Sequence, residues 1–271
     1  MRRLLILVLV LTSCTAWAWA RTFTTGSRWG SGIGPGFAPY QAVSVGTGTG
    51  ATVDPAPASP YMEFKSGNWT LSDATHVSQW SDSSGNARHA TQTTALDQPT
   101  VDVNGLLFPA AQSALIAPVA IPLPTSTVVV TFYVPGAERA LGSIFSSGIL
   151  STTTYVDYPL ELPSGSNQEQ YYTITGTPVW FSFAGRTGTI VTVGRRFSYP
   201  AYSFWVEGVE VSSASSGLGN ANNFAGEKMV IGNSCYNLLR STAMRVICLR
   251  VYNRWISDAD MATMASWSRT I

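Results

Sequence analysis

The chain has 271 residues, of which only 11% are charged, and its formal net charge is +1 at pH 7. Soluble domains average about 25% charged residues; here Ser, Thr, Gly and Asn supply the polarity instead, as is typical of turn-rich β-sheet proteins. A chain so close to neutrality does not attract phosphate backbones, so the composition argues against nucleic acid as a partner.

The first 20 residues predict export. Arg2 and Arg3 precede an unbroken run of eight aliphatic residues, and Ala18 and Ala20 then provide the small residues that signal peptidase needs. The run is too short to span a bilayer, which takes about 20 apolar residues. Cleavage there would remove both arginines and change the net charge from +1 to −1. We therefore predict a signal peptide at 1–20 and a secreted or cell-surface protein.

The same segment permits a second interpretation. Leu11 to Cys14 (LTSC) resembles a bacterial lipobox, in which the cysteine is acylated and becomes the mature N-terminus. Acylation of Cys14 would make the protein a membrane-anchored lipoprotein, and it is the only route to a membrane that the sequence offers. A signal of 13 residues is short, so the sequence favours free secretion.

Residues 21–60 differ in composition from the rest of the chain. They are rich in Gly, Thr, Ala and Pro and lack a sustained hydrophobic period, which predicts a flexible linker or a partly ordered arm. Trp29, Phe37 and Tyr40 are the groups with which such an arm would dock. The remaining residues are enough for one large domain, which we place at 61–271.

From residue 61 onward, short β-branched and aromatic runs alternate with turn residues, which predicts strands. The runs lie at 126–134, 179–183, 189–193, 202–206, 209–212, 228–231 and 243–252. We expect the third run to end at Gly194. Glu207 and Gly208 form a two-residue hairpin turn between the fourth and fifth runs, with Glu207 facing solvent. This pattern, with almost no helix, predicts an all-β, two-sheet antiparallel sandwich.

One helix is predicted at the C-terminus. Ser257 is a good N-cap with Asp260 three residues later, as in a capping box, and Ile256 and Met261 occupy the two staple positions. Met264 continues the apolar stripe at helical spacing, so we expect this helix to pack on the sheet.

Two segments resemble the laminin-G-like, concanavalin A-like domains of bacteria and phages. Residues 76–92 (HVSQWSDSSGNARHATQ) resemble the opening signature V-x-x-W-x-D-x-S-G-N-x-x-H-A-x-Q, and residues 231–233 (IGN) and 251–259 (VYNRWISDA) resemble the closing segments. Trp255 stands where the family commonly has a small residue. The resemblance brackets 61–271 and implies a jelly-roll sandwich, a fold that hosts lectins, glycosidases, adhesion modules and virion parts alike.

The signature residues have a structural interpretation. We expect Trp80 to pack between the sheets, Asp82 and Asn86 to stabilise a turn, and His89 to form a hydrogen bond within the same corner. The alternative is a calcium site at Asp82 and Asn86, because oxygen ligands suit that ion. A single carboxylate is little charge for tight calcium binding, so the structural interpretation is favoured and no cofactor is required.

An inventory of reactive groups argues against catalysis. His76 and His89 are the only histidines and both lie in the signature, so neither a Ser-His-Asp set nor a His-rich metal site is available. A glycosidase needs two carboxylates facing one sugar, and the E-x-D-x-x-E strand pattern of catalytic members of this fold class is absent. We therefore expect the protein not to be an enzyme.

Binding of carbohydrate is the function that the aromatic and polar residues favour, because sugar rings stack on Trp and Tyr while Asn, Asp and Arg hydrogen-bond hydroxyls. The candidate ligand-binding residues are Tyr199, Tyr236, Trp205, Arg195, Arg196 and Asn233. The two tyrosines lie in loop-like segments and are preferred, whereas Trp205 lies in an alternating strand, a position more typical of core. The alternative is a structural or adhesion protein of a surface layer, filament or virion, whose sandwich self-associates or contacts other proteins.

Cys235 and Cys248 are left as a pair once Cys14 is cleaved off or acylated. A disulfide between them would contribute about 3 kcal/mol in the chain-entropy model. The alternative is two buried thiols on neighbouring strands, and the sequence leaves both open, since it does not show whether the Cβ atoms approach.

Overall fold

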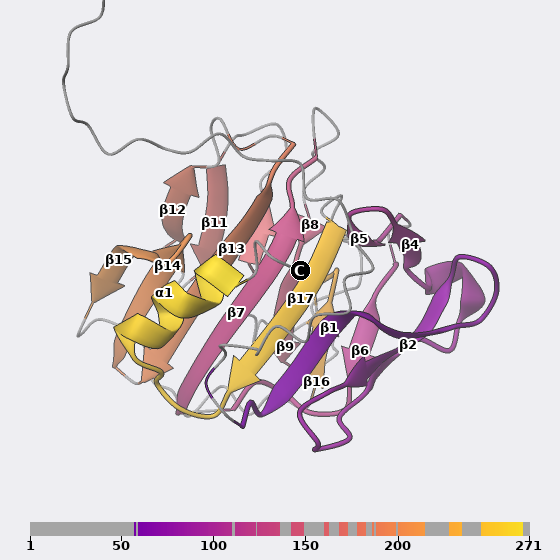
Figure 1. Ribbon diagram of the computed structural model, residues 1–271, viewed down its shortest axis with the longest axis horizontal. Coiled ribbons are helices and arrows are strands. Elements are labelled where there is room, and N and C mark those ends of the chain that lie inside the picture. Colours follow the sequence, from indigo (N-terminus) through magenta and orange to yellow (C-terminus); the bar gives the residue numbers. More distant parts are fainter. Residues whose placement is uncertain are drawn as a thin grey trace, which may run out of the picture. The chain divides into compact units, whose positions relative to one another are not determined.

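The structure is a computed structural model (Figure 1). It describes residues 57, 59–109, 112–122, 124–135, 142–148, 160–162, 168–172, 178–182, 186, 188–198, 200–214, 228–234 and 245–267. Four of the candidates for ligand binding, disulfide formation and lipidation lie outside this set: Cys14, Tyr199, Tyr236 and Cys235. The predicted signal peptide and most of the predicted arm lie outside it as well.

The described strands form two antiparallel sheets (Figure 1). The larger sheet follows the order β15-β14-β13-β7-β17-β1-β2-β3-β6-β16-β9, with β5 paired to β17 and β4 to β5, and the smaller follows β12-β11-β10-β8. The strands are β1 (Met62–Leu71), β2 (Val77–Asp82), β3 (Ala90–Thr91), β4 (Thr100–Asp102), β5 (Gly105–Leu107), β6 (Leu115–Ala117), β7 (Thr125–Tyr133), β8 (Gly142–Ser143), β9 (Phe145–Gly148), β10 (Leu160–Leu162), β11 (Gln168–Tyr172), β12 (Pro178–Ser182), β13 (Ile190–Ser198), β14 (Ala201–Val206), β15 (Val209–Ala214), β16 (Lys228–Ile231) and β17 (Arg245–Tyr252). A 3-10 turn, η1 (Ala95–Asp97), and one helix, α1 (Asp258–Trp267), complete the described elements.

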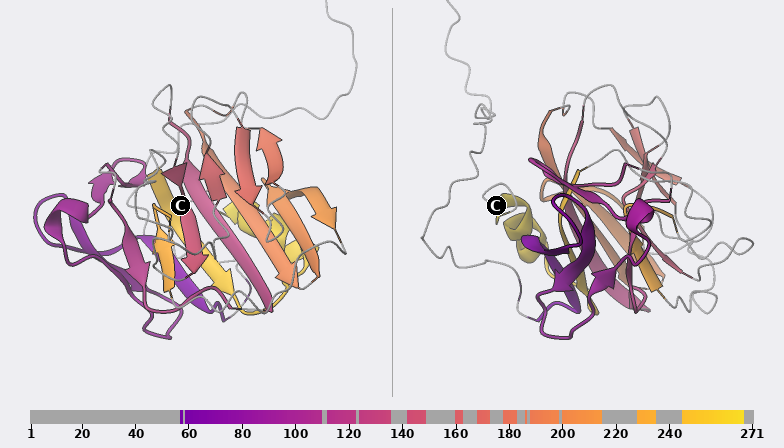
Figure 2. Two further views of the ribbon diagram at one scale, coloured as in Figure 1. Left: turned by 180° about the vertical axis from the view of Figure 1, so that it is seen from behind. Right: turned by 90° about the vertical axis from the view of Figure 1, so that its right-hand side faces the viewer.

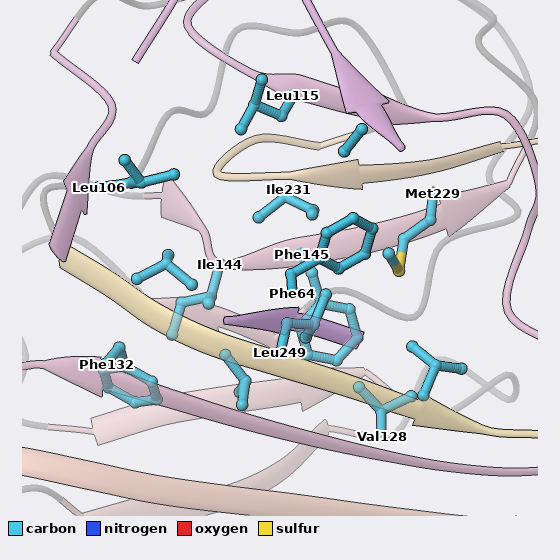
Figure 3. Close-up of a cluster of buried hydrophobic side chains, with 14 of the residues drawn as sticks. Phe64, Leu106, Leu115, Val128, Phe132, Ile144, Phe145, Met229, Ile231 and Leu249 are labelled. Carbon is cyan, nitrogen blue, oxygen red and sulfur yellow. The ribbon is translucent and has the colours of Figure 1, made fainter. Parts of the chain in front are cut away.

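The core lies where two parts of the larger sheet face each other (Figure 3). Phe64 of β1, Phe132 of β7 and Leu249 of β17 belong to the same buried cluster as side chains of β9 and β16. Figure 3 shows Phe145 and Ile231 among the latter. Trp80 is fully buried in this cluster, as predicted, and its indole N–H donates to the carbonyl of Lys65 at 2.7 Å. The predicted all-β sandwich is confirmed.

Alternation along β7 separates two apolar clusters. Val128 and Val130 point into the core, whereas Val129 points to the opposite, outer face and packs with Met261 and Met264 of α1. Since successive side chains of a strand point to opposite faces, one strand can serve both clusters. The right-hand view in Figure 2 shows α1 lying against one face of the sheet. We call this the outer face.

The start of α1 agrees with the predicted cap. The hydroxyl of Ser257 accepts the backbone N–H of Asp260 at 3.1 Å and donates to the Asp260 carboxylate at 2.8 Å. Ile256 and Met261, the staple pair, are buried. The capping residues and the apolar stripe therefore do what their spacing predicts.

The strand predicted to end at Gly194 instead continues through it to Ser198. A Cβ atom at residue 194 would lie 2.1 Å from the Cε atom of Met261. The glycine is therefore the space into which the helix side chain packs, and it does not mark a turn.

The hairpin between β14 and β15 is confirmed, but the orientation of its turn residue differs from the prediction. Glu207 and Gly208 have φ angles of 54° and 75°, as a two-residue turn requires. The side chain of Glu207 does not face solvent: it is 10% exposed and its Oε1 accepts the backbone N–H of Thr192 at 2.7 Å. Its carboxylate also lies 3.8 Å from the guanidinium of Arg186.

Candidate functional site

Arg196 organises a polar cluster on the outer face. It projects from β13, and its guanidinium lies between two indole rings, 4.5 Å from the ring centroid of Trp205 and 4.6 Å from that of Trp255. Trp205 comes from β14, whereas Trp255 comes from the segment that leads into α1. The stacked arrangement therefore connects two strands with the entry to the helix, and each ring offers the cation its electron-rich face.

The nitrogens of this guanidinium are engaged by surrounding oxygens. Nε donates to the hydroxyl of Ser203 at 2.8 Å, and Nη2 donates to Oε2 of Glu210 at 3.3 Å. Nη1 donates to the carbonyl of Ile256 at 3.1 Å and also to Oδ1 of Asp258. Because the Arg196 side chain is only 3% exposed, these contacts replace the water that it gives up on burial.

The outer rim of the cluster is open to solvent. Trp255 is 37% exposed, and among the residues whose side chains are described it is the only exposed aromatic one. The side chains of Asp258 and Glu210 are 76% and 37% exposed. We call these three residues the Trp255 patch: an indole with two carboxylates beside it, supported from below by the buried Arg196. An exposed indole can stack on the C–H face of a ring, and the carboxylates can accept hydroxyl hydrogens.

The structure places the predicted ligand-binding residues in different parts of the fold. Arg195 follows the alternation of β13 to the inner face, where it is buried and its Nη2 donates to the hydroxyl of Ser126 at 3.3 Å. Asn233 is fully buried after β16, and its Nδ2 donates to the carbonyl of Ser113 at 3.1 Å. Neither Arg195 nor Asn233 therefore belongs to the Trp255 patch.

Arg196 and Trp205 do come together, but as the support of the patch. Trp205 is 6% exposed, and its indole N–H donates to the hydroxyl of Ser203 at 2.9 Å. It thus takes the buried position that its alternating strand favoured. A ligand arriving from solvent would meet Trp255, a residue that was not among the sequence candidates. The only feature of the sequence that pointed to Trp255 was the presence of a bulky indole where the laminin-G-like domains commonly have a small residue.

Asp82, the alternative calcium ligand, has a full set of hydrogen-bond donors. Its carboxylate accepts the backbone N–H groups of Glu63, Ser84 and Arg88 at 2.9, 2.9 and 3.0 Å, and the hydroxyl of Ser84 at 2.8 Å. Burial raises the pKa of Asp82, but these hydrogen bonds outweigh it, so the pKa lies below its ordinary value of 3.8.

The neighbours of Asp82 form the same corner. Asn86 donates from Nδ2 to the carbonyl of Tyr61 and the hydroxyl of Ser84, both at 3.1 Å, and His89 accepts the backbone N–H of Asp82 at its Nδ1 at 3.0 Å. Calcium binding at Asp82 and Asn86 would have to displace these donors. The part of the chain that the structure describes contains no group of three or more His, Cys, Asp or Glu residues placed to hold a metal ion.

An exposed Asp–His pair lies in the turn between β1 and β2. Oδ2 of Asp73 is 2.7 Å from Nδ1 of His76, and backbone N–H groups of His76 and Thr75 lower the pKa of Asp73 to about 2. The nearby hydroxyl of Ser72 donates to the Gln98 side chain and the His76 carbonyl, not to the imidazole. The hydroxyl of Thr75 lies 3.4 Å from Nδ1 of His76 and 3.5 Å from Oδ1 of Asp73, so the described contacts of this pair are those within one turn.

Two remaining predictions concern cysteine chemistry and the membrane. Cys248 is buried on β17, whereas Cys235 lies outside the described residues, so their disulfide stays a prediction. Among the residues that the structure describes, no helix is long and apolar enough to cross a bilayer.

Comparison with known proteins finds similarity in structure only. No family model matches the sequence, and no curated protein matches it significantly. A Trypanosoma rangeli sialidase in complex with sialic acid superposes with a TM-score of 0.55 at 15% identity, over 75% of this chain and 32% of the sialidase. The same sialidase with a difluoro-KDN ligand gives a TM-score of 0.56 at 15% identity, over 76% of this chain and 32% of that one. A mutant of HCR/D gives 0.54 at 10% identity, over 77% and 51% of the two chains.

The likeness is one of fold. At these identities it shows an antiparallel β-sandwich, and the chain spans about a third of the length of the sialidases it matches.

These matches contradict the expectation that the protein is not an enzyme, because the sialidases among them are enzymes. That expectation rested on the lack of a Ser-His-Asp set and of paired strand carboxylates. Sialidases use a tyrosine nucleophile and so stand outside the paired-carboxylate scheme of most glycosidases. The inventory of histidines and paired strand carboxylates therefore did not test for the chemistry that those sialidases use.

Proposed function

We propose that this chain is an exported carbohydrate-recognising protein that presents Trp255 to a sugar ring on the outer face of its sandwich. The observation that carries the proposal is the exposure of this one indole directly above a buried, fully engaged guanidinium. Exposed aromatic side chains beside hydrogen-bonding groups are the usual means of recognising a ring that is apolar on its faces and polar at its edge.

The cluster below Trp255 favours binding because it holds the indole in place. Arg196 stacks on one face of the ring, and its Nη1 donates a hydrogen bond to the carbonyl of Ile256, the residue after Trp255. A side chain that is already ordered loses less conformational entropy when a ligand arrives, which improves affinity without a new contact. Asp258 and Glu210 add exposed carboxylates to the same cluster, and these can accept hydroxyl hydrogens of a sugar.

The fold likeness supports sugar as the ligand class. The matching sialidase structures contain sialic acid and related sugars, and their sandwich is shared over three quarters of this chain. The finer assignment to the laminin-G-like branch of concanavalin A-like folds belongs to the proposal. It rests on the signature at residues 76–92, whose Asp82 corner forms the turn that the resemblance implies.

Export is also part of the proposal and rests on the N-terminal sequence. Mass spectrometry of the mature protein would distinguish an N-terminus at Arg21, expected after signal cleavage, from an acylated N-terminus at Cys14. An intact Met1 on protein recovered from its native compartment would contradict export.

The test of recognition is a glycan array probed with residues 21–271. For the glycans that bind, Trp255→Ala should weaken affinity by about 30-fold, the effect of removing an aromatic hot spot. Val103→Ala is the matched control, because Val103 is an exposed apolar residue, 83% accessible, in the turn between β4 and β5. Unchanged melting temperatures would show that both variants fold. Equal glycan affinity of Trp255→Ala and Val103→Ala, or no glycan binding by the parent protein, would contradict the proposal.

A second function, protein contact in a surface assembly, is favoured by one observation. β15 is the last strand of its sheet in the described pairing, and it exposes Val209 and Val211 by 63% and 48%. Exposed apolar side chains on a sheet edge are typical of association between chains. Sedimentation that shifts with concentration and is abolished by Val209→Lys, without glycan binding, would support this function over the first.

A further inference from the structure

The charge of the Trp255 patch bears on which sugars it accepts, and the inference rests on the proposed function. Arg196 is the only cation in the described contacts of the cluster, and it is not accessible to a ligand. Its guanidinium lies over two indole rings, 4.5 and 4.6 Å from their centroids, and Nε, Nη1 and Nη2 all donate to oxygens of the protein. A bidentate arginine–carboxylate pair, the usual means of holding an acidic sugar, would require at least two of these bonds to break.

The accessible charges of the patch are negative. Asp258 and Glu210 carry two carboxylates against one buried guanidinium, so the described cluster has a formal charge of −1. Asp260, in the same first turn of α1, adds a further carboxylate that accepts the Ser257 hydroxyl. Arg254, the residue before Trp255, is an exposed cation outside the described contacts of Arg196. Its guanidinium lies over the ring of Tyr252, 5.4 Å from the centroid, and donates to the carbonyl of Ser59 at 3.4 Å.

We propose that the Trp255 patch recognises sugars that carry hydroxyl or amide donors and no carboxylate or sulfate, and that it discriminates against sialic acid. An uncharged sugar offers the hydroxyl hydrogens that Asp258 and Glu210 can accept. The carboxylate of a sialic acid bound at the patch would be repelled by these two groups, and Arg196, the cation that contacts them, is buried and engaged by protein oxygens. The ligand class therefore differs from the sialic acid bound in the matching sialidase structures, although the fold is shared.

The experiment uses an array of glycan pairs that differ only in a terminal sialic acid, probed with residues 21–271. Each asialo glycan should bind about tenfold more tightly than its sialylated partner. Removal of the sialic acids on the array itself should raise the signal at the sialylated positions. Higher ionic strength should narrow the difference, because the carboxylates are exposed and salt screens them.

Three variants test the cause. Asp258→Asn and Glu210→Gln keep the hydrogen-bonding shape but remove a charge, so each should reduce the preference for asialo glycans by a few-fold. Asp97→Asn removes a carboxylate of η1, outside the patch, and should leave the preference unchanged.

The possible outcomes separate the two proposals. Binding that depends on Trp255 but is equal or stronger for sialylated glycans would overturn this inference and leave carbohydrate recognition standing. The same holds if the preference for asialo glycans survives both Asp258→Asn and Glu210→Gln unchanged. An array on which no binding depends on Trp255 would overturn the proposed function, and the inference with it.

Discussion

The Asp82 corner and the Arg196 cluster under the Trp255 patch both hold a charged side chain away from water, but the partners of the two side chains lie at different distances along the chain. Two of the residues that donate to Asp82, Ser84 and Arg88, lie two and six positions away. The oxygens that accept from Arg196 include those of Ile256 and Asp258, which lie 60 and 62 positions away.

This difference separates stability from binding. Backbone N–H groups of Ser84 and Arg88 in the turn, and of Glu63 on β1, stabilise the buried Asp82 carboxylate. In the Arg196 cluster the guanidinium is buried and its hydrogen bonds are made within the protein, whereas Trp255 and the carboxylates of Asp258 and Glu210 are exposed to solvent. Functional surfaces commonly lie where segments distant in sequence meet on a rigid scaffold.

The largest effect is expected from removing the cation under the patch. Arg196→Ala should lower the free energy of unfolding by about 3 kcal/mol, since it deletes a stacked cation and leaves the carbonyl of Ile256 without its donor. The change should also loosen α1, because Nη1 of Arg196 contacts the residues at its start. Urea unfolding measures the first effect, and hydrogen exchange of the α1 amides measures the second.

Glu210→Gln is the matched control for that variant. It removes a partner whose side chain is 37% exposed, and surface ion pairs contribute less than about 1 kcal/mol. Equal losses of stability in Arg196→Ala and Glu210→Gln would show that the stacking between the two indoles contributes little.

A smaller effect is expected at the corner. Asp82→Ala should cost about 2 kcal/mol, because three backbone N–H groups and one hydroxyl lose their acceptor. Since the folded pKa of Asp82 is below 3.8, its contribution is present above that pH and is lost as the pH falls through the lowered folded pKa. Unfolding measured from pH 6 to pH 2 should therefore show a smaller acid-induced loss in Asp82→Ala than in the parent protein.

The exposed Asp73 also has a lowered pKa, about 2, and contributes to the same acid range. Asp73→Asn should therefore be included as the comparison. If Asp82→Ala and the parent protein lose stability in parallel down to pH 2, the hydrogen bonds of the corner do not set the pKa of Asp82.

The smallest effect is expected at the helix cap. Ser257→Ala removes the acceptor of the Asp260 N–H and should cost about 1 kcal/mol, whereas Ser257→Asp should retain most of the stability. Thermal unfolding checks both. A loss as large in Ser257→Asp as in Ser257→Ala would place the role of Ser257 elsewhere than in capping.

By itself the sequence determined part of the local structure, although β1, β2 and β11 were not among the predicted runs. The predicted run at 228–231 coincides with β16, and the Glu207–Gly208 turn and the Ser257 cap form where their residues predict. Each of these depends on groups within a few positions of one another: a period of two, a left-handed turn, or a hydroxyl three residues from its donor.

Only the tertiary structure decided which side chains face solvent and which meet. Arg195 and Arg196 are neighbours in sequence, yet alternation sends one to the inner face and the other under Trp255. Gly194 is a gap for Met261 of α1, a residue 67 positions away. Such partners come together only when the sheet has formed and the helix has packed on it. The free energy that brings them together is a property of the packed fold, and no short window of sequence contains it.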